Sequence, residues 1–131
     1  MRRVYLDACI VIYLMENAAP FSEKTRQFLA RHGDAILCVS PLVRMEVMIK
    51  PLRESAALLV ADYEEFLAAQ NWLFINDSTF DRALQLRAQH GLKTPDALHL
   101  ATAIQHGCSE LWTNDDRLNK AAGGMAINVL A

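Results

Sequence analysis

Short apolar runs alternate with helical patterns along the whole chain. Five runs are typical of strands, because they are brief, rich in large or branched apolar side chains, and bounded by polar or turn residues. Between them, apolar positions recur every three or four residues, as on one face of a helix. The expected strands are 2–6, 35–39, 72–75, 109–113 and 126–130, and the expected helices are 8–17, 22–32, 41–50, 53–70, 78–90, 94–106 and 115–122.

Residues that begin and end helices support these boundaries. Ser22 can cap the second helix, which Gly33 ends. Ser40 followed by Pro41 predicts the start of the third helix, since serine caps and proline fits the first turn. That helix is expected to end before Pro51, because the residue preceding a proline avoids the helical region.

Alternation of strands and helices predicts the α/β class. Parallel strands need crossover connections, so we expect one parallel sheet of about five strands with helices covering both faces. Neither a repeat nor a linker interrupts the pattern, and 131 residues are the length of one ordinary domain. We therefore interpret residues 1–131 as a single domain.

Composition narrows the possible functions. Hydrophobic residues make up 53% and charged residues 21%, which is typical of a compact folded protein. The net charge of −2 argues against binding nucleic acid by charge alone, so such a role needs a local basic patch or a bound cation. No apolar run reaches the roughly 20 residues of a membrane span. The basic, then apolar, N-terminus is interrupted by Asp7 and lacks a cleavage site, so we expect a cytoplasmic protein.

The three cysteines, Cys9, Cys38 and Cys108, stand singly in apolar surroundings. An odd number without a CxxC pair makes a disulfide framework or a zinc site a poor interpretation. We expect them to be small buried side chains.

The helix TPDALHLATAI raises the question of chemistry. At about 100° per residue, Asp96 falls on the same arc as Ala97, Leu100 and other apolar residues. His99 falls toward the opposite arc, which carries Thr102 and polar neighbours, so we expect it at an edge or in a structural role. A carboxylate directed toward the apolar side needs a partner there.

Three further carboxylates are expected near the same edge of the sheet. Asp7 ends the first strand, Asp115 follows the fourth, and Glu46 lies on the helix that leaves the second. Ligands of open α/β sheets bind outside the carboxyl ends of the strands. Each residue also has an ordinary explanation: Asp7 and Asp115 can cap helices, the helix dipole favours Asp96, and Glu46 can pair with Lys50 one turn later.

The joint arrangement is harder to explain without a cation. Two carboxylates about 5 Å apart repel by about 3 kcal/mol at an effective dielectric near 20. Four of them would cost as much as the stability margin of many domains. Oxygen ligands suit a hard ion, so the pattern predicts Mg²⁺, with Mn²⁺ as a possible substitute, bound by Asp7, Glu46, Asp96 and Asp115.

Four segments together resemble the PIN-domain ribonucleases, most closely the VapC-type toxins of type II toxin–antitoxin systems. They are DACIVIYL, SPLVRMEV, TPDALHLATA and LWTNDDRL, in this order along nearly the whole chain. The resemblance implies a three-layer α/β/α fold. It also implies that Asp7, Glu46, Asp96 and Asp115 hold Mg²⁺ and form the catalytic centre.

This resemblance also implies a reaction and partners. The expected activity is Mg²⁺-dependent endoribonucleolytic cleavage of RNA that leaves 5′-phosphate and 3′-hydroxyl ends. Asp7 and Asp96 are the first choice as direct metal ligands, Asp115 is expected to complete the shell or hold a second ion, and Glu46 is expected to orient or deprotonate the attacking water. The expected partners are a small VapB-like antitoxin and a second copy of the chain in a homodimer.

The chain departs from the family pattern in places. Cys9 stands where the family often has a polar Asn, Ser or Thr, and a thiol is a weak hydrogen-bond donor. The last motif has two adjacent acids, of which Asp115 fits better and Asp116 is expected at the start of the helix. A hydroxyl such as that of Ser40 often precedes the acidic helix, although capping explains it. His99 recurs in similar motifs.

Other side chains have both a functional and an ordinary interpretation. Trp72 and Trp112 fall in expected strands and are expected to fill the core. Met15, Met45 and Met48 could line a dimer surface, although burial in the core is the simpler interpretation. Candidates for a basic rim that contacts RNA, each also explained as a solvated charge, are Arg44, Arg82, Arg87, Lys93 and Arg117.

Three other interpretations fit parts of the sequence. An aspartate-nucleophile phosphatase needs a second Asp where Cys9 stands, and a receiver domain needs an N-terminal acidic pair, although Asp77 does follow an expected strand. The alternative that remains is a catalytically inactive PIN-like module that acts by binding, which only Cys9 favours. Neither the RNA target nor the number of metal ions follows from these residues.

Overall fold

The structure, a computed structural model, describes residues 2–130. Its strands are β1 (Arg2–Leu6), β2 (Ala35–Val39), β3 (Asn71–Trp72), β4 (Glu110–Thr113) and β5 (Ala126–Asn128). Its helices are α1 (Ala8–Met15), α2 (Phe21–Ala30), α3 (Pro41–Arg53), α4 (Ala57–Ala68), α5 (Asp77–His90), α6 (Thr94–Gln105) and α7 (Asp116–Ala122), followed by the short 3₁₀ turn Gly123–Met125. The expected α/β class is confirmed; the first and last residues of the expected domain lie outside the described range.

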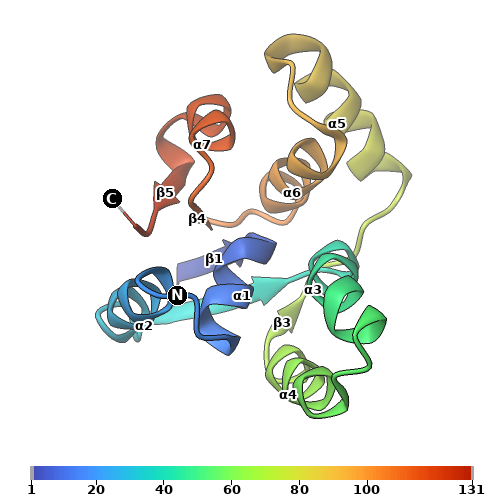
Figure 1. Cartoon of the computed structure of the whole chain (residues 1–131). Coiled ribbons are helices and arrows are strands. Elements are labelled where there is room, and N and C mark those ends of the chain that lie inside the picture. The colour runs from blue at the N-terminus through green and yellow to red at the C-terminus, as the bar shows by residue number, and fades with distance from the viewer. Residues whose placement is uncertain (1, 131) are drawn as a thin grey trace.

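One parallel sheet forms the centre of the fold. The strand order is β3-β2-β1-β4-β5, and every neighbouring pair is parallel. Figure 1 shows α5, α6 and α7 on one side of this sheet and α1 to α4 on the other. Strand order reverses between β1 and β4, so the chain leaves these two neighbours toward opposite faces. The carboxyl ends of β1 and β4 are therefore the switch point where α/β folds bind ligands.

Apolar side chains of the sheet and of the adjoining helix faces make up the core. Tyr5, Leu111 and Trp112 are fully or almost fully buried in the sheet, and Ile10 and Leu100 cover it from α1 and α6. The central strands β1 and β4 are buried at their carboxyl ends, because helices lie on both faces. A rigid core thus supports the end of each central strand.

Several local expectations were wrong. Trp72 is 41% exposed, because β3 is a two-residue edge strand and not the four-residue strand expected; its indole N–H donates to the carbonyl of Leu67 instead of entering the core. Trp112 is buried as expected. Among the methionines, Met48 is in the core, whereas Met45 is 56% exposed.

Two predicted helix ends differ for identifiable reasons. Helix α3 continues through Pro51 to Arg53. Pro51 lies in the last turn, where its missing N–H removes one hydrogen bond only, and its ring is buried. Helix α2 begins at Phe21, so Ser22 is inside it and does not cap it. The Ser22 hydroxyl instead donates to the carbonyl of Glu16 and accepts from the N–H of Ala18, which closes the α1–α2 loop.

No helix within residues 2–130 combines the length and the apolar character that a membrane crossing requires.

Candidate metal centre

Asp7 lies at the switch point, directly after β1. Its backbone N–H donates to the carbonyl of Trp112 in β4, which ties the two strand ends together. One carboxylate oxygen accepts from the N–H of Ala8 at 2.7 Å, so Asp7 caps α1, and the other accepts from the hydroxyl of Thr113 at 2.8 Å. The residue is only 8% exposed. These bonds hold a nearly buried carboxylate in one orientation.

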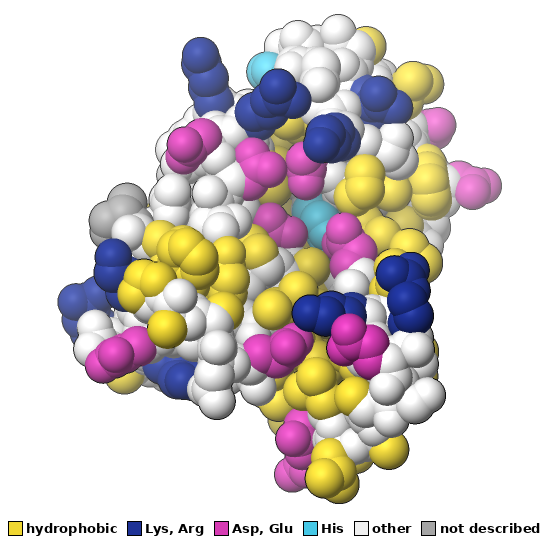
Figure 2. Space-filling view, viewed as in Figure 1, with side chains coloured by type: hydrophobic (Ala, Val, Ile, Leu, Met, Phe, Trp, Pro, Cys, Tyr) yellow, Lys and Arg dark blue, Asp and Glu magenta, His cyan; other side chains and the backbone are white. Residues whose placement is uncertain are grey.

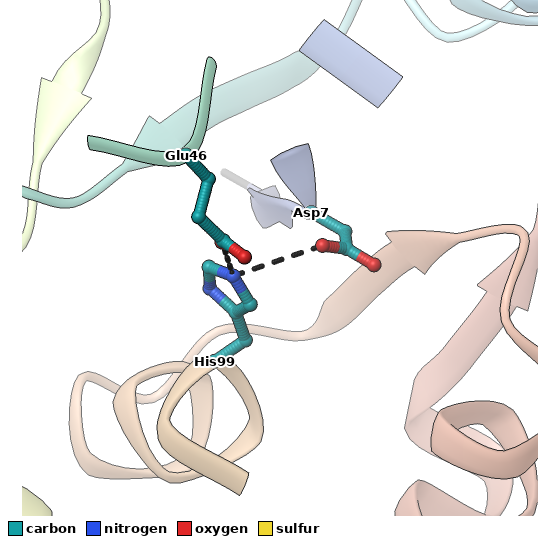
Figure 3. Close-up of side chains that lie close together, drawn as sticks. All are labelled: Asp7, Glu46 and His99. Carbon is teal, nitrogen blue, oxygen red and sulfur yellow. Dashed lines mark hydrogen bonds and ion pairs between the residues drawn. The ribbon is translucent and has the colours of Figure 1, made fainter. Parts of the chain in front are cut away.

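Glu46 reaches the same place from α3. Its Oε1 is hydrogen bonded to Nε2 of His99, which comes from α6. The same His99 nitrogen lies 3.7 Å from Oδ1 of Asp7. Figure 3 shows the two carboxylates directed toward the imidazole from different elements. Potential ligand atoms of all three residues lie within 4.8 Å of one another, close enough to share one ion.

Of the two alternatives expected for His99, an edge position or a structural role, the edge position was wrong. Its side chain is 1% exposed, and every residue of α6 from Ala97 to Ala103 is buried. A helical wheel assumes one solvent-facing side, but α6 contacts β4, α5 and α7 and has no such side at this level. The polar arc that the wheel assigned to His99 is therefore the side that faces Glu46 and Asp7.

A buried hydrogen-bonded chain extends behind the imidazole. Nδ1 of His99 lies 2.6 Å from the hydroxyl of Tyr5, which lies 2.8 Å from Oγ of Ser40. Ser40 accepts from the N–H of Val43 and so caps α3, as expected. Burial raises the pKa of the Tyr5 phenol, which stays neutral and keeps its proton for this chain. The chain of contacts links the cap of α3 with the carboxylate of Glu46.

Asp96 is half-buried in the first turn of α6. Burial raises the pKa of its carboxyl group, and the negative charges of Asp115, Asp7 and Glu46 raise it further, while His99 acts in the opposite direction. The charges of the other three predicted carboxylates therefore act on Asp96. Within residues 2–130, however, the group of ligand atoms within 4.8 Å of one another comprises Asp7, Glu46 and His99, and includes neither Asp96 nor Asp115.

Asp115 follows β4 and caps α7. Its Oδ1 accepts from the N–H groups of Arg117 and Leu118, at 2.8 and 3.2 Å. Its own N–H donates to Oγ1 of Thr113, the hydroxyl that also binds Asp7. Asp116 is exposed in the first turn of α7. Thr113 thus joins Asp115 to Asp7, a connection that sequence analysis missed although the threonine stands at the end of a strand.

A family comparison agrees with this geometry. The PIN domain model matches residues 4–124. The chain belongs to the PIN-domain family. No curated protein shows significant similarity to its sequence.

Solved structures of similar fold include toxin–antitoxin complexes and a toxin. The toxin–antitoxin complex from Klebsiella pneumoniae is 25% identical, with a TM-score of 0.77 and coverage of 96% of this chain and 97% of that one. DNA-bound VapBC from Salmonella typhimurium is 21% identical, with a TM-score of 0.69 and 98% of both chains covered. A sarcin–ricin-loop-cleaving toxin from Mycobacterium tuberculosis is 12% identical, with a TM-score of 0.76, and covers 90% of this chain and 94% of that one.

Around the centre of this PIN domain, charges of both signs share one face. Figure 2 shows acidic side chains gathered about a histidine in the middle of the face, with Lys and Arg side chains on either side. Among the candidates for a basic rim, Arg44 pairs with Glu64 at 2.8 Å. Arg87 donates to the carbonyl of Leu92 and to the hydroxyl of Thr94. These two arginines already have protein partners.

Cys9 lies beside Asp7 of this PIN domain. Its Sγ is 3.7 Å from Oδ2 of Asp7. Burial and the neighbouring carboxylate raise the pKa of the thiol to about 12, so the sulfur is neutral at physiological pH. A neutral thiol donates a weak hydrogen bond to Asp7 and adds no charge to the cluster.

Proposed function

We propose that this PIN domain is a Mg²⁺-dependent endoribonuclease, the toxin of a toxin–antitoxin pair. The observation that carries the proposal is the meeting of Asp7, Glu46 and His99 at the switch point of a PIN fold, with ligand atoms within 4.8 Å of one another. The charges of Asp7, Glu46 and Asp115 also act on Asp96, and this supports including Asp96 and Asp115 in the proposed site. Structural carboxylates rarely converge in this way, because their repulsion destabilises the fold. A bound divalent cation would offset this repulsion between the carboxylates.

The donor set fits Mg²⁺, with Mn²⁺ as a substitute. Asp7 and Asp96 are the proposed direct ligands, with Asp115 and Glu46 completing the set, and carboxylate oxygens are the ligands that these hard ions prefer. The raised pKa of Asp96 fits as well, since its charge lacks compensation from the protein alone. When bound, such an ion acidifies water, neutralises the phosphate and stabilises the leaving 3′ oxygen.

The protein's own groups would orient the reaction. Glu46 is the proposed base that orients the attacking water and accepts its proton. His99 is a positioning residue, since it holds Glu46 from one side while Tyr5 fixes its ring from the other. Ala8 and Thr113 fix Asp7, so the ligand oxygens are oriented before substrate arrives.

RNA is the proposed substrate, because the four motifs resemble those of VapC-type toxins. Products would carry 5′-phosphate and 3′-hydroxyl ends. The modest net charge of −2 predicts few phosphate contacts and hence a shallow salt dependence of binding. Arg82, Lys93 and Arg117 are the proposed contacts, since all three are exposed.

An antitoxin of the VapB type is the proposed regulator, and the cytoplasm the proposed location. Support comes from the neighbours, which include a toxin–antitoxin complex and a DNA-bound VapBC assembly. We also propose a homodimer. Met45, Ile49 and Leu52 recur at helical spacing on α3 and are each about half exposed or more, which is typical of a helix that packs on a partner. Size-exclusion chromatography with and without the neighbouring gene product tests both proposals.

An inactive PIN-like binding module is the second candidate, and Cys9 is the observation that favours it. The two candidates differ in one experiment: sequencing of RNA ends after induction, with Asp96→Asn as the control. Cuts that carry 5′-phosphates in the parent and disappear in the variant support the nuclease. Identical RNA ends in both, together with retained Mg²⁺ binding by the parent, would support the binding module.

A further inference from the structure

A cavity of about 360 Å³ adjoins the carboxylate centre, between the end of α1 and the middle of α3. Glu46 belongs to both the cavity and the carboxylate centre, because it lines the cavity and contacts His99 in the centre. We propose that this cavity binds one base of the substrate, a guanine of the nucleotide next to the scissile phosphate. The inference rests on the proposed ribonuclease function and names the residues that select the sequence.

Apolar side chains form part of the cavity wall. Ile12 comes from α1, and Val47 and Pro51 come from α3. Such side chains offer dispersion contacts to a flat ring but no hydrogen bonds to a phosphate or sugar. The volume is in the range of small-molecule pockets and accommodates one base.

The charges of the cavity favour a neutral group over a phosphate. Glu16 and Glu46 are two carboxylates, and Lys50 is the single cation in the lining. A phosphate would meet an excess of negative charge, whereas a base brings none. The backbone phosphate is therefore expected at the metal centre and the attached base in this cavity.

Hydrogen-bonding groups of the cavity select guanine among the bases. Oε2 of Glu16 accepts from the hydroxyl of Tyr63, a fully buried residue, so this carboxylate is held in place. A carboxylate only accepts, and guanine presents two adjacent donors, N1–H and the N2 amino group. Adenine and cytosine place a ring nitrogen acceptor beside their amino group, and uracil flanks its single N–H with two carbonyls, so each would set lone pairs against the carboxylate.

The acceptor on the same edge of guanine fits the donors of the cavity. Lys50 has neither an ion pair nor a side-chain hydrogen bond within residues 2–130. Asn17 accepts from Arg26 through Oδ1 at 3.4 Å, which leaves its amide N–H₂ as a donor. Guanine O6, next to N1, is an acceptor for either group. The cavity thus complements both kinds of group on one edge.

An arginine side chain of a protein partner fits less well. A guanidinium offers donors only, so it could pair with Glu16, Glu46 and Oδ1 of Asn17, but it would leave the ammonium of Lys50 unpaired and close to a like charge. Guanine uses both kinds of lining group.

The test measures binding separately from cleavage. Short single-stranded RNAs that differ only in one base, guanine, inosine or adenine, are titrated against Asp96→Asn protein and against Asp96→Asn/Glu16→Gln protein. We expect guanine to bind about 10-fold tighter than inosine, which lacks the amino group, and tighter still than adenine, with the difference lost in the Glu16→Gln form. Glu54→Gln, which removes an exposed carboxylate at the end of α3, should leave the preference unchanged.

Sequencing of the RNA ends made by the otherwise native chain completes the test. Cuts should share a guanine at one fixed position beside the scissile phosphate, and Glu16→Gln should abolish that preference. Equal binding of the three RNAs, or an unchanged preference in Glu16→Gln, overturns the inference. The inference is also overturned if Glu16→Gln protein binds a purified antitoxin more weakly than the parent does but binds the three RNAs with unchanged affinity. Guanine-selective binding without any cleavage would instead overturn the proposed reaction and leave the base site standing.

Discussion

Nε2 of His99 lies between two carboxylates: it is hydrogen bonded to Oε1 of Glu46 and lies 3.7 Å from Oδ1 of Asp7. Because Nδ1 is held by the hydroxyl of Tyr5, the ring cannot turn without breaking a buried contact. The imidazole therefore couples the orientation of Glu46 to the interior of the fold.

Replacing His99 should weaken the metal centre. We expect His99→Ala to weaken Mn²⁺ binding by about 10- to 100-fold, as removal of groups that orient metal ligands commonly does. Tyr5→Phe keeps the ring and removes only the hydroxyl, so its effect should be smaller. Electron paramagnetic resonance titration of Mn²⁺ measures both. Equal affinities in parent and His99→Ala protein would show that the contact with Glu46 has no role in metal binding.

Removing the charge of Asp96 should stabilise the metal-free protein. Burial and the charges of Asp115 and Asp7 raise the pKa of this carboxyl above its ordinary value of 3.8, so the folded state binds the proton more tightly than the unfolded state. The free energy of unfolding therefore falls as pH rises above that value, and the loss persists at neutral pH. Asp96→Asn should melt above the parent at neutral pH in chelator and near the parent in acid.

Added Mg²⁺ should reverse that order, because ligand binding stabilises only the protein that can bind it. Asp62→Asn, an exposed aspartate on α4, is the control and should follow the parent at every pH. A lower melting temperature of Asp96→Asn in chelator at neutral pH would mean that the native carboxylate is compensated within the protein.

Glu46→Gln and Asp7→Asn should separate proton transfer from metal binding. The glutamine keeps an oxygen that accepts from His99, so the site stays assembled while the base is lost. Cleavage should fall by about 100-fold or more, the usual contribution of a general base. Asp7→Asn should weaken Mg²⁺ binding more than Glu46→Gln does. Calorimetric Kd values for Mg²⁺, measured beside single-turnover cleavage rates, separate the two roles. A larger loss of Mg²⁺ affinity in Glu46→Gln than in Asp7→Asn would reverse the assigned roles.

The adjacent aspartates provide a matched pair. Asp115→Asn keeps a side-chain oxygen for the N–H groups of Arg117 and Leu118, so the helix cap and the melting temperature should survive. Its cleavage rate should nevertheless fall, because one carboxylate of the proposed metal site is lost. Asp116→Asn should retain parental activity. The opposite ranking of rates would move the fourth ligand to Asp116.

Cys9→Ser should give Asp7 a stronger hydrogen-bond donor. The neutral thiol is 3.7 Å from Asp7, and a hydroxyl donates a stronger hydrogen bond to that carboxylate. A gain in cleavage of up to about 10-fold is expected, equivalent to one ordinary hydrogen bond. Cleavage rates of the parent and of Cys9→Ser, measured on the same RNA, test this expected gain. If both bind Mg²⁺ and neither cuts, the inactive binding module is the better account.

The sheet and the order of its elements were predictable from hydrophobic periodicity. The spacing of apolar residues and the residues that end helices and strands depend only on nearby sequence. The exposure of Trp72 and the burial of His99 were not, since both depend on which elements pack on β3 and α6. Asp7, Asp96 and Asp115 could be named because each follows a strand end or begins a helix, and Glu46 because it lies on the helix that follows a strand. The contacts that hold these carboxylates could not be predicted, because their partners are distant in the sequence. Glu46 and His99 are 53 residues apart, and Asp7 and Thr113 are 106 apart.

Calorimetric titration with Mg²⁺ and Mn²⁺ of the parent, beside Asp7→Asn and Asp96→Asn, tests the central claim most directly. If the four carboxylates form a cation site, the parent binds both ions and each variant loses most of that affinity. Absence of ion binding by the parent, or equal binding by all three proteins, would contradict the account.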